Sequence, residues 1–196
     1  MNKLLAATLL ASAFAAPAWA APQTYNIDPT HTFARFAYKH MGLSTQLSRF
    51  DKTSGSVTVD PVAKTGSVDV TVDITSVDTG FAPFNGHIQG ANFLDAATYP
   101  TATFKSTRVV FEGDKPTKVE GNLTIKGVTK PVTLTITSFS SVEHPMLKKP
   151  AIGADATAVI KRSDFNAGAY APAVADEVTL NLSLIHISEP TRLLSI

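Results

Sequence analysis

Apolar and polar residues alternate along most of the chain, which is the pattern of β-strands that bury one face. The clearest stretch is 67–74, where three valines and Ile74 alternate with serine, threonine and aspartate. We expect the first strand to be broken at Asp28–Pro29 and the second to be distorted near Ser54–Gly55. In all, the pattern predicts about eight strands, at 25–40, 46–60, 67–74, 101–112, 119–125, 132–136, 152–162 and 178–184.

The stretch Phe84–Thr107 interrupts this pattern in the middle of the chain. Over His87–Leu94 the apolar residues are spaced for one or two helical turns rather than for a strand. Pro100 marks the return to extended chain, because a proline disfavours helix in the residue before it. The sequence therefore predicts a short helix between two β-rich halves.

About eight antiparallel strands of this length can close into a barrel that leaves no exposed sheet edge. Small residues, Ala154, Ala156 and Ala158, share one face of the strand predicted at 152–162, and a wall of small side chains would keep the interior open for a ligand. An immunoglobulin-like sandwich is the alternative, but the chain has no cysteine and its one tryptophan, Trp19, precedes the first strand. The expected fold is an all-β antiparallel barrel.

Several short motifs occur in a fixed order along the chain. They are Tyr25–His31 (YNIDPTH), His40–Gly42, His87, Asn92–Phe93, Tyr99–Thr107 (YPTATFKST), Gly121–Leu134 (GNLTIKGVTKPVTL) and Arg162–Phe165. Together they resemble the YceI-like family of periplasmic lipocalin-like proteins that bind polyisoprenoid and related lipids. The resemblance covers roughly Thr24 to Leu184. It implies a lipocalin-like barrel that holds an isoprenoid chain or another long amphiphilic lipid, with no further cofactor.

The N-terminal end has the features of a secretory signal peptide. Lys3 is followed by the apolar run Leu4–Phe14 and then by Ala18–Trp19–Ala20, a small-residue cleavage site. We expect residues 1–20 to be removed after Ala20 and the mature protein to lie in the periplasm. The lack of cysteine excludes both a disulfide framework and an acylated lipoprotein cysteine.

Charge argues against a nucleic-acid partner. The chain has 17 basic and 16 acidic residues, and removal of residues 1–20 takes away one lysine, which leaves 16 of each. Binding to a phosphate backbone needs a basic stripe, whereas the lysines here alternate with acids along the strands. The sequence is compatible with transient contact with a membrane and with a homodimer, and it decides neither.

The C-terminal end departs from the pattern. Alternation stops at Leu184, and residues 185–196 match nothing expected of the family and resemble a translated sequencing adapter. A genuine C-terminal extension is the alternative. We therefore expect the lipid-binding barrel to span residues 21–184, and we leave His186 and Arg192 out of the candidate site.

Candidate ligand-binding residues come from one-sided apolar strands and from the loops beside the helix. Phe36, Tyr38 and His40 share one face of the first strand, opposite Arg35 and Lys39. The alternative is that these apolar faces only form a filled core. The full set of expected ligand-binding residues is Phe36, Tyr38, His40, Phe84, His87, Phe93, Phe104, Ala154, Ala156, Ala158 and Arg162.

Individual polar residues in this set allow two interpretations. The histidines lack the close i,i+2 or i,i+4 spacing of metal ligands, so we expect no metal site. His40 and His87 either bond a lipid head group or are structural. Arg162 either pairs with an acid such as Asp164 or faces a phosphate or phenol oxygen at the barrel rim.

The sequence contains no Gly-X-Ser-X-Gly elbow, and Asp69 and Asp73 fall on the wet face of their strand. We therefore expect a non-enzymatic carrier of polyisoprenoid or similar lipid. An enzyme acting on a quinone-like or lipid substrate is the alternative, and a structural or protein-binding module with a filled core is a third.

Overall fold

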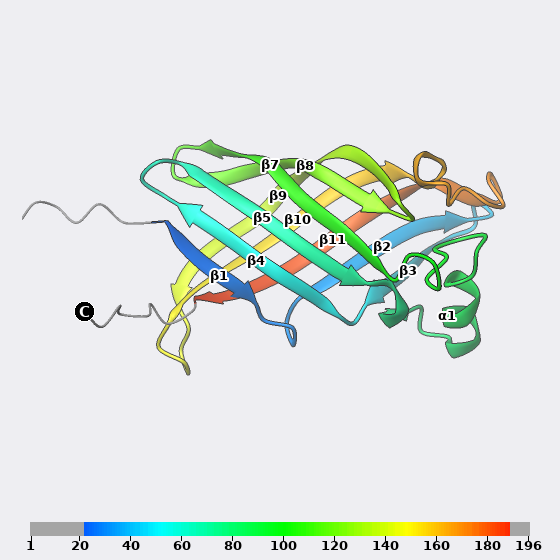
Figure 1. Cartoon of the computed structure of the whole chain (residues 1–196), viewed down its shortest axis with the longest axis horizontal. Helices are drawn as coiled ribbons and strands as arrows, with labels where there is room; N and C mark the ends of the chain where they lie inside the picture. The colour runs from blue at the N-terminus through cyan, green and yellow to red at the C-terminus, as the bar shows by residue number, and fades with distance from the viewer. Residues whose placement is uncertain (1–21, 189–196) are drawn as a thin grey trace, which may run out of the picture.

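The computed structural model describes residues 22–188, which form one closed antiparallel β-barrel with a short helix at one end (Figure 1). The barrel order is β1–β4–β5–β7–β8–β9–β10–β11, and β11 pairs with β1 to close the sheet. The predicted eight-stranded all-β barrel is therefore confirmed. The strands are β1 (Gln23–Ile27), β2 (Phe33–His40), β3 (Ser44–Phe50), β4 (Thr53–Asp60), β5 (Thr65–Asp73), β6 (Val77–Asp78), β7 (Thr101–Glu112), β8 (Lys115–Ile125), β9 (Val128–Glu143), β10 (Pro150–Lys161) and β11 (Val174–Ser188).

Two of the barrel positions are each occupied by a pair of short strands. β1 and β2 both pair with β11, and the break between them lies at the expected Asp28–Pro29. The Thr32 hydroxyl fills the gap, because it donates to the carbonyl of Ile185 and accepts from the Ile185 amide, each at 3.1 Å. β3 and β4 likewise pair with β2 and β1, so the interruption in the second strand falls at 51–52 rather than at Ser54–Gly55.

Gly55 nevertheless has a specific role. Its φ is +140°, and a Cβ at this position would collide with the backbone of Asp69 and Val70 on β5. Only glycine combines this φ with so close an approach of two strands. The β4–β5 pairing thus depends on the residue that the sequence marked as irregular.

The segment between β5 and β7 carries the helix, but earlier than predicted. A 3-10 turn, η1 (Ile74–Ser76), leads through β6 to α1 (Ala82–Ile88), so the prediction of helix over His87–Leu94 was wrong. Pro83 favours the earlier start. Proline lacks a backbone N–H, which the first helical turn does not use, and its ring fixes φ near the helical value. The Thr79 hydroxyl and amide both donate to Asn85 Oδ1, at 2.7 and 2.8 Å, and secure that turn.

The last strand also differs from expectation, since β11 continues past Leu184 to Ser188. His186 and Ser188 are buried, and their segment pairs with both β1 and β10. These residues complete the barrel because β1 has no other partner on that side. Residues 189–196 and the predicted signal peptide, residues 1–20, lie outside the described residues.

The two ends of the barrel are unlike. At one end lie α1, the β2–β3 turn, the β8–β9 turn and the segment between β10 and β11, which includes the 3-10 helix η2 (Arg162–Phe165) (Figure 1). At the other lie the β4–β5, β7–β8 and β9–β10 connections. We call the first of these the helix end.

Candidate functional site

The barrel encloses a cavity of about 480 Å³. Its walls come from inward-facing residues of several strands, because alternate residues of each strand point inward. On β5 these are Val68, Val70 and Val72, and on β11 they are Leu180, Leu182 and Leu184. The volume lies within the range of roughly 300–1,000 Å³ typical of small-molecule sites. The alternative of a completely filled core therefore does not describe this barrel.

The cavity opens at the helix end. Exposed side chains among its lining residues are His40 at the end of β2, Met41 in the turn that follows, His87 on α1, and Tyr170 and Ala173 between η2 and β11. All of these belong to segments at that end (Figure 1). We call this opening the mouth.

A row of four rings crosses the mouth. Phe84 and His87 of α1 lie 5.7 Å apart, His87 and Phe93 5.1 Å, and Phe93 and Tyr170 5.6 Å between ring centroids. The first three come from α1 and the turn that follows it, and Tyr170 comes from the segment before β11. We call these residues the aromatic row. The aromatic row connects the α1 side of the mouth to the segment before β11. The connection consists of ring contacts and not of sheet hydrogen bonds.

Arg162 lines the cavity, and within residues 22–188 its hydrogen bonds all go to backbone carbonyls. Nε donates to Ala175 at 2.9 Å and Nη2 to Val174 at 2.8 Å, while Nη1 donates to Ala167 at 2.6 Å and to Ala169 at 3.2 Å. The guanidinium therefore holds together both sides of the segment between η2 and β11. The sequence allowed either an ion pair between Arg162 and an acid such as Asp164 or a place for Arg162 at the barrel rim. Among the described residues, Arg162 and Asp164 form no ion pair.

The carboxylate whose charge acts on Arg162 is that of Asp176, which is itself hydrogen-bonded to Ser163. Asp176 accepts hydrogen bonds from the Ser163 hydroxyl at 2.6 Å and the Ser163 amide at 2.8 Å. These bonds, assisted by the Arg162 charge, hold the pKa of Asp176 below its usual value. Burial lowers the pKa of Arg162, and the field of Asp176 opposes that shift. A positive charge thus lies beside the cavity without a carboxylate in direct contact.

Tyr38 faces the same region from β2. Burial raises the pKa of its phenol, although the Arg162 charge acts in the opposite direction. The hydroxyl is therefore protonated at neutral pH and able to donate a hydrogen bond. Tyr38, Arg162 and the histidines of the mouth place the polar groups of the cavity at the helix end.

Lys126, in the turn between β8 and β9, secures the mouth from a third side. Its Nζ donates to the carbonyl of Ala91 at 2.6 Å and to that of Asn166 at 2.8 Å. Ala91 follows α1, and Asn166 follows η2. The ammonium thus joins the two flanks that the aromatic row also connects.

Deeper in the cavity, Thr53 at the start of β4 is 4% exposed. Its Oγ1 has no hydrogen-bond partner among the described residues. A buried unpaired hydroxyl costs free energy, so a polar atom of a bound molecule would be favoured beside it.

Most of the sequence-predicted site residues meet in this cavity. Those that line it are Phe36, Tyr38, His40, Phe84, His87, Phe93, Phe104 and Arg162. The three alanines of β10 do not. Ala156 and Ala158 lie in a packed cluster with Phe104, Leu123, Leu134 and Phe165, and Ala154 is half-buried between its strand neighbours Phe139 and Leu184. The expectation that they border open space is not met, because larger inward side chains of other strands fill the space over them.

Sequence reasoning missed several cavity residues. The valines of β5 and the leucines of β11 line the cavity. The alternation that identified both strands could have identified these residues as inward-facing. Tyr170 also escaped the predicted set, and no local pattern indicates that it lies against Phe93. Lys126 gave no signal, since a lysine in a hairpin turn is usually solvated.

Two negative observations apply to residues 22–188 alone. Nowhere in that range do three His, Asp or Glu side chains converge as a metal ion would require. Within the same range, the single α-helix is too short and too polar to cross a bilayer.

Comparison with known proteins gives concordant results. The model of the YceI-like domain matches residues 25–185. A relative named Protein YceI from Escherichia coli O157:H7 is 37% identical over 189 residues, which cover 94% of this chain and 97% of the relative.

Solved structures agree in fold. The crystal structure of BcnA from Burkholderia cenocepacia is 31% identical, with a TM-score of 0.70 over 81% of this chain and 98% of that one. A polyisoprenoid binding domain from Saccharophagus degradans has a TM-score of 0.66 over 85% of this chain and 99% of its own. At 19% identity, the second likeness concerns the fold alone.

Proposed function

Because this chain belongs to the YceI-like family, we propose that it is a periplasmic carrier that binds a polyisoprenoid or a similar long-chain amphiphilic lipid inside its barrel. The observation that carries this proposal is the apolar cavity of about 480 Å³, open at one end. An apolar chain gains free energy on leaving water for such a cavity, at roughly 25 cal/mol per Å² of surface removed from water. The description of the Saccharophagus degradans domain as polyisoprenoid binding supports the same class of ligand.

The distribution of polar groups gives the ligand a direction. The valines of β5 and leucines of β11 form an apolar interior, whereas Tyr38 and Arg162 lie toward the mouth. We therefore place the hydrocarbon chain in the interior and the polar end of the lipid near these two residues. A charged donor beside the cavity favours an oxygen-bearing head group.

Native mass spectrometry tests this function. The protein is purified from the periplasm without detergent, weighed intact, and then extracted so that any bound lipid can be identified. We expect a mass increment that organic extraction removes, carried by a long-chain lipid. The enzyme alternative instead predicts that incubation converts the lipid into a product, and a protein of unliganded mass under all loading conditions would contradict both.

A cavity-filling variant locates the ligand. Val70 points into the cavity from β5, so Val70→Trp should occupy the space of the lipid chain and abolish the mass increment while the far-UV spectrum stays β-rich. The matched control is Thr71→Trp, because adjacent strand residues point to opposite faces. Full lipid load in Val70→Trp would show that the ligand lies elsewhere.

A further inference from the structure

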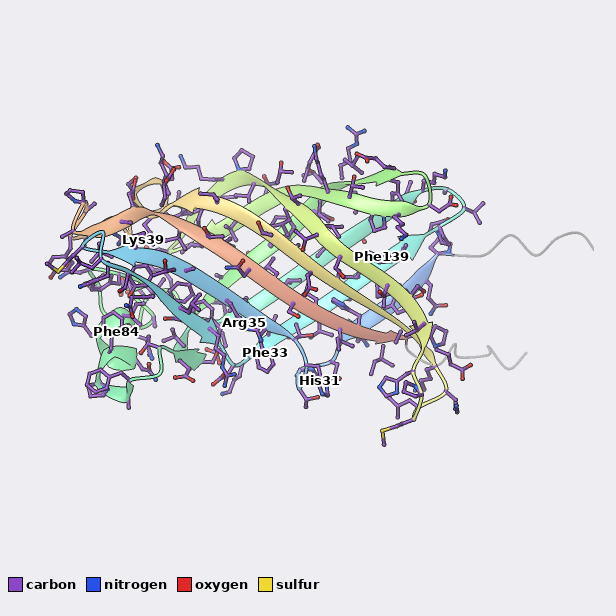
Figure 2. The ribbon with its side chains drawn as sticks, turned by 180° about the vertical axis from the view of Figure 1, so that it is seen from behind. His31, Phe33, Arg35, Lys39, Phe84 and Phe139 are labelled. Carbon is purple, nitrogen blue, oxygen red and sulfur yellow. The ribbon has the colours of Figure 1, made fainter. Side chains whose placement is uncertain are left out.

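The hairpin of β2 and β3 combines an apolar tip with a basic stem. Between Phe33 and Phe50 the chain contains Arg35, Lys39 and Arg49 and no acidic residue. At the tip, Met41 is 63% exposed and Leu43 is 83% exposed. Figure 2 shows Arg35 and Lys39 along β2, with Lys39 at the same end of the molecule as Phe84 of α1.

The basic side chains differ in how they are neutralised. Arg49 pairs with Asp51 at 2.7 Å. Among the described residues, neither Arg35 nor Lys39 takes part in an ion pair. Arg35 instead lies over the ring of Phe33, 5.2 Å from its centroid, and Lys39 is exposed. Lys39 near the mouth, and Arg35 farther along β2, therefore remain available to an anionic partner.

Three further stretches at the helix end carry no charged residue, although Lys126 of the β8–β9 turn and Arg162 and Asp164 of η2 lie at the same end. Residues 40–48, 79–94 and 165–175 contain no Asp, Glu, Lys or Arg. From them project Phe81, 65% exposed, and Tyr170, 56% exposed. We call Met41, Leu43, Phe81 and Tyr170 the apolar rim.

The opposite end provides a contrast. Its exposed apolar residues, Val62, Met146 and Leu147, lie in turns that also carry charged side chains. Lys64 of one turn pairs with Asp114 at 3.5 Å, and Lys148 pairs with Glu143 at 3.8 Å. Isolated exposed apolar residues are normal on a protein surface, whereas several on charge-free segments around one opening indicate a binding surface.

The apolar rim is continuous with the cavity. Met41 and Tyr170 belong to both, since each lines the cavity and is more than half exposed. A lipid chain that moved along these residues would keep its apolar surface covered throughout the transfer. A second copy of the protein seated on the rim would instead cover the mouth.

On these grounds we propose that the helix end docks onto the surface of a bilayer that contains anionic lipid. This inference rests on the proposed lipid-binding function. The apolar rim lies in the boundary between head groups and acyl chains, as exposed apolar side chains do in proteins that lie on membranes. Lys39 stays at the level of the anionic head groups, and Arg35 lies farther from the membrane surface. The mouth then faces the bilayer from which the lipid is taken or to which it is delivered.

Vesicle flotation tests the docking. Protein is mixed with vesicles of phosphatidylethanolamine and phosphatidylglycerol, or with vesicles of phosphatidylcholine alone, and the floated fraction is measured. We expect binding to the anionic vesicles. Leu43→Glu should weaken it about tenfold or more, since a leucine loses its transfer out of water and a negative charge meets an anionic surface. Lys39→Gln should weaken binding to the anionic vesicles about fivefold and change little with phosphatidylcholine.

The matched control is Met146→Glu, which makes the same charge change at an equally exposed apolar residue of the opposite end and should leave flotation unchanged. Equal losses in Leu43→Glu and Met146→Glu would overturn the docking surface. The proposal would also be overturned if the apolar rim joined two copies of the protein. In that case the wild type would be a dimer that does not float with the vesicles, and Leu43→Glu would be a monomer.

Lipid load separates this inference from the function on which it rests. Leu43 does not line the cavity, so Leu43→Glu loaded with polyprenol from ethanol should carry the same bound mass as the wild type. Wild-type protein that takes up polyprenol but does not float would overturn the docking alone. Protein that floats but never takes up polyprenol or another lipid would overturn the proposed function.

Discussion

The ring of Tyr170 stacks on the ring of Phe93 with their centroids 5.6 Å and their planes 28° apart. One residue precedes β11 and the other follows α1, so the contact joins two segments across the mouth of the cavity. The Asn92 side-chain amide adds a long hydrogen bond of 3.5 Å to the Tyr170 hydroxyl. A lipid that enters or leaves through this opening therefore passes the ring contact.

Removal of the Tyr170 ring should speed lipid release. An aromatic pair contributes about 0.5–1.5 kcal/mol beyond its buried area, so Tyr170→Ala should raise the dissociation rate roughly 3- to 10-fold. Stopped-flow release of a fluorescent lipid analogue measures this rate. Tyr170→Phe keeps the ring and should release at nearly the wild-type rate. An unchanged rate in Tyr170→Ala would show that release does not pass Tyr170.

Arg162→Lys should destabilise the protein although it keeps the charge. A lysine cannot reproduce the guanidinium fork, so the carbonyls of Ala167, Ala169 and Val174 would lose partners. We expect the free energy of unfolding in urea to fall by about 2 kcal/mol or more. Lys161→Met is the control, because that neighbour is exposed. Equal stability of Arg162→Lys and the wild type would contradict the structural role.

Ala156→Trp should behave differently from a cavity-filling variant. Ala156 packs in the cluster that contains Leu134 and Phe165, so tryptophan there overpacks a dense region and should cost about 1–3 kcal/mol or more of stability. The lipid load of the fraction that stays folded should be close to that of the wild type. Urea titration and native mass spectrometry measure the two effects. Loss of lipid at undiminished stability would instead mean that Ala156 borders the ligand.

Stability should depend on pH through His186. Burial lowers the pKa of His186 to about 4, against 6.5 in an exposed chain. Between these values the unfolded chain binds a proton that the folded protein excludes, so the folded state loses stability as the pH falls from about 6.5 to about 4. The loss at this site should be on the order of 3 kcal/mol.

His186→Leu provides the control for this titration, because it removes the group. The variant should lose most of the decline between pH 6.5 and 4 and keep any decline below pH 4, where Asp28 and Asp176, whose pKa values are lowered by hydrogen bonds, become protonated. The same slope in His186→Leu and the wild type would assign the pH dependence to other groups.

Much of the barrel could be predicted from the sequence because strand formation leaves a local signal. Alternation marked β5 and β7, and Thr101–Glu112 has the bounds that the pattern indicated. Glycine and proline marked the irregular points at Gly55 and Asp28–Pro29. The motifs between Tyr25 and Phe165, taken together, indicated the YceI-like family.

The site depended on relations that no local pattern contains. Period two tells which side of β10 faces inward, but what lies opposite is set by strand tilt and register, so Ala156 proved to be packed while Val70 borders open space. The partners of Arg162 are backbone carbonyls of the loop after η2 and of the start of β11, and backbone groups are the same in every sequence. Closure of the barrel by residues 185–188 likewise depends on β1 and β10, because the backbone groups of this segment find their hydrogen-bond partners only on those two strands. The sequence by itself thus determined which residues form strands and which face each presents, and only the tertiary structure decided where the barrel is hollow.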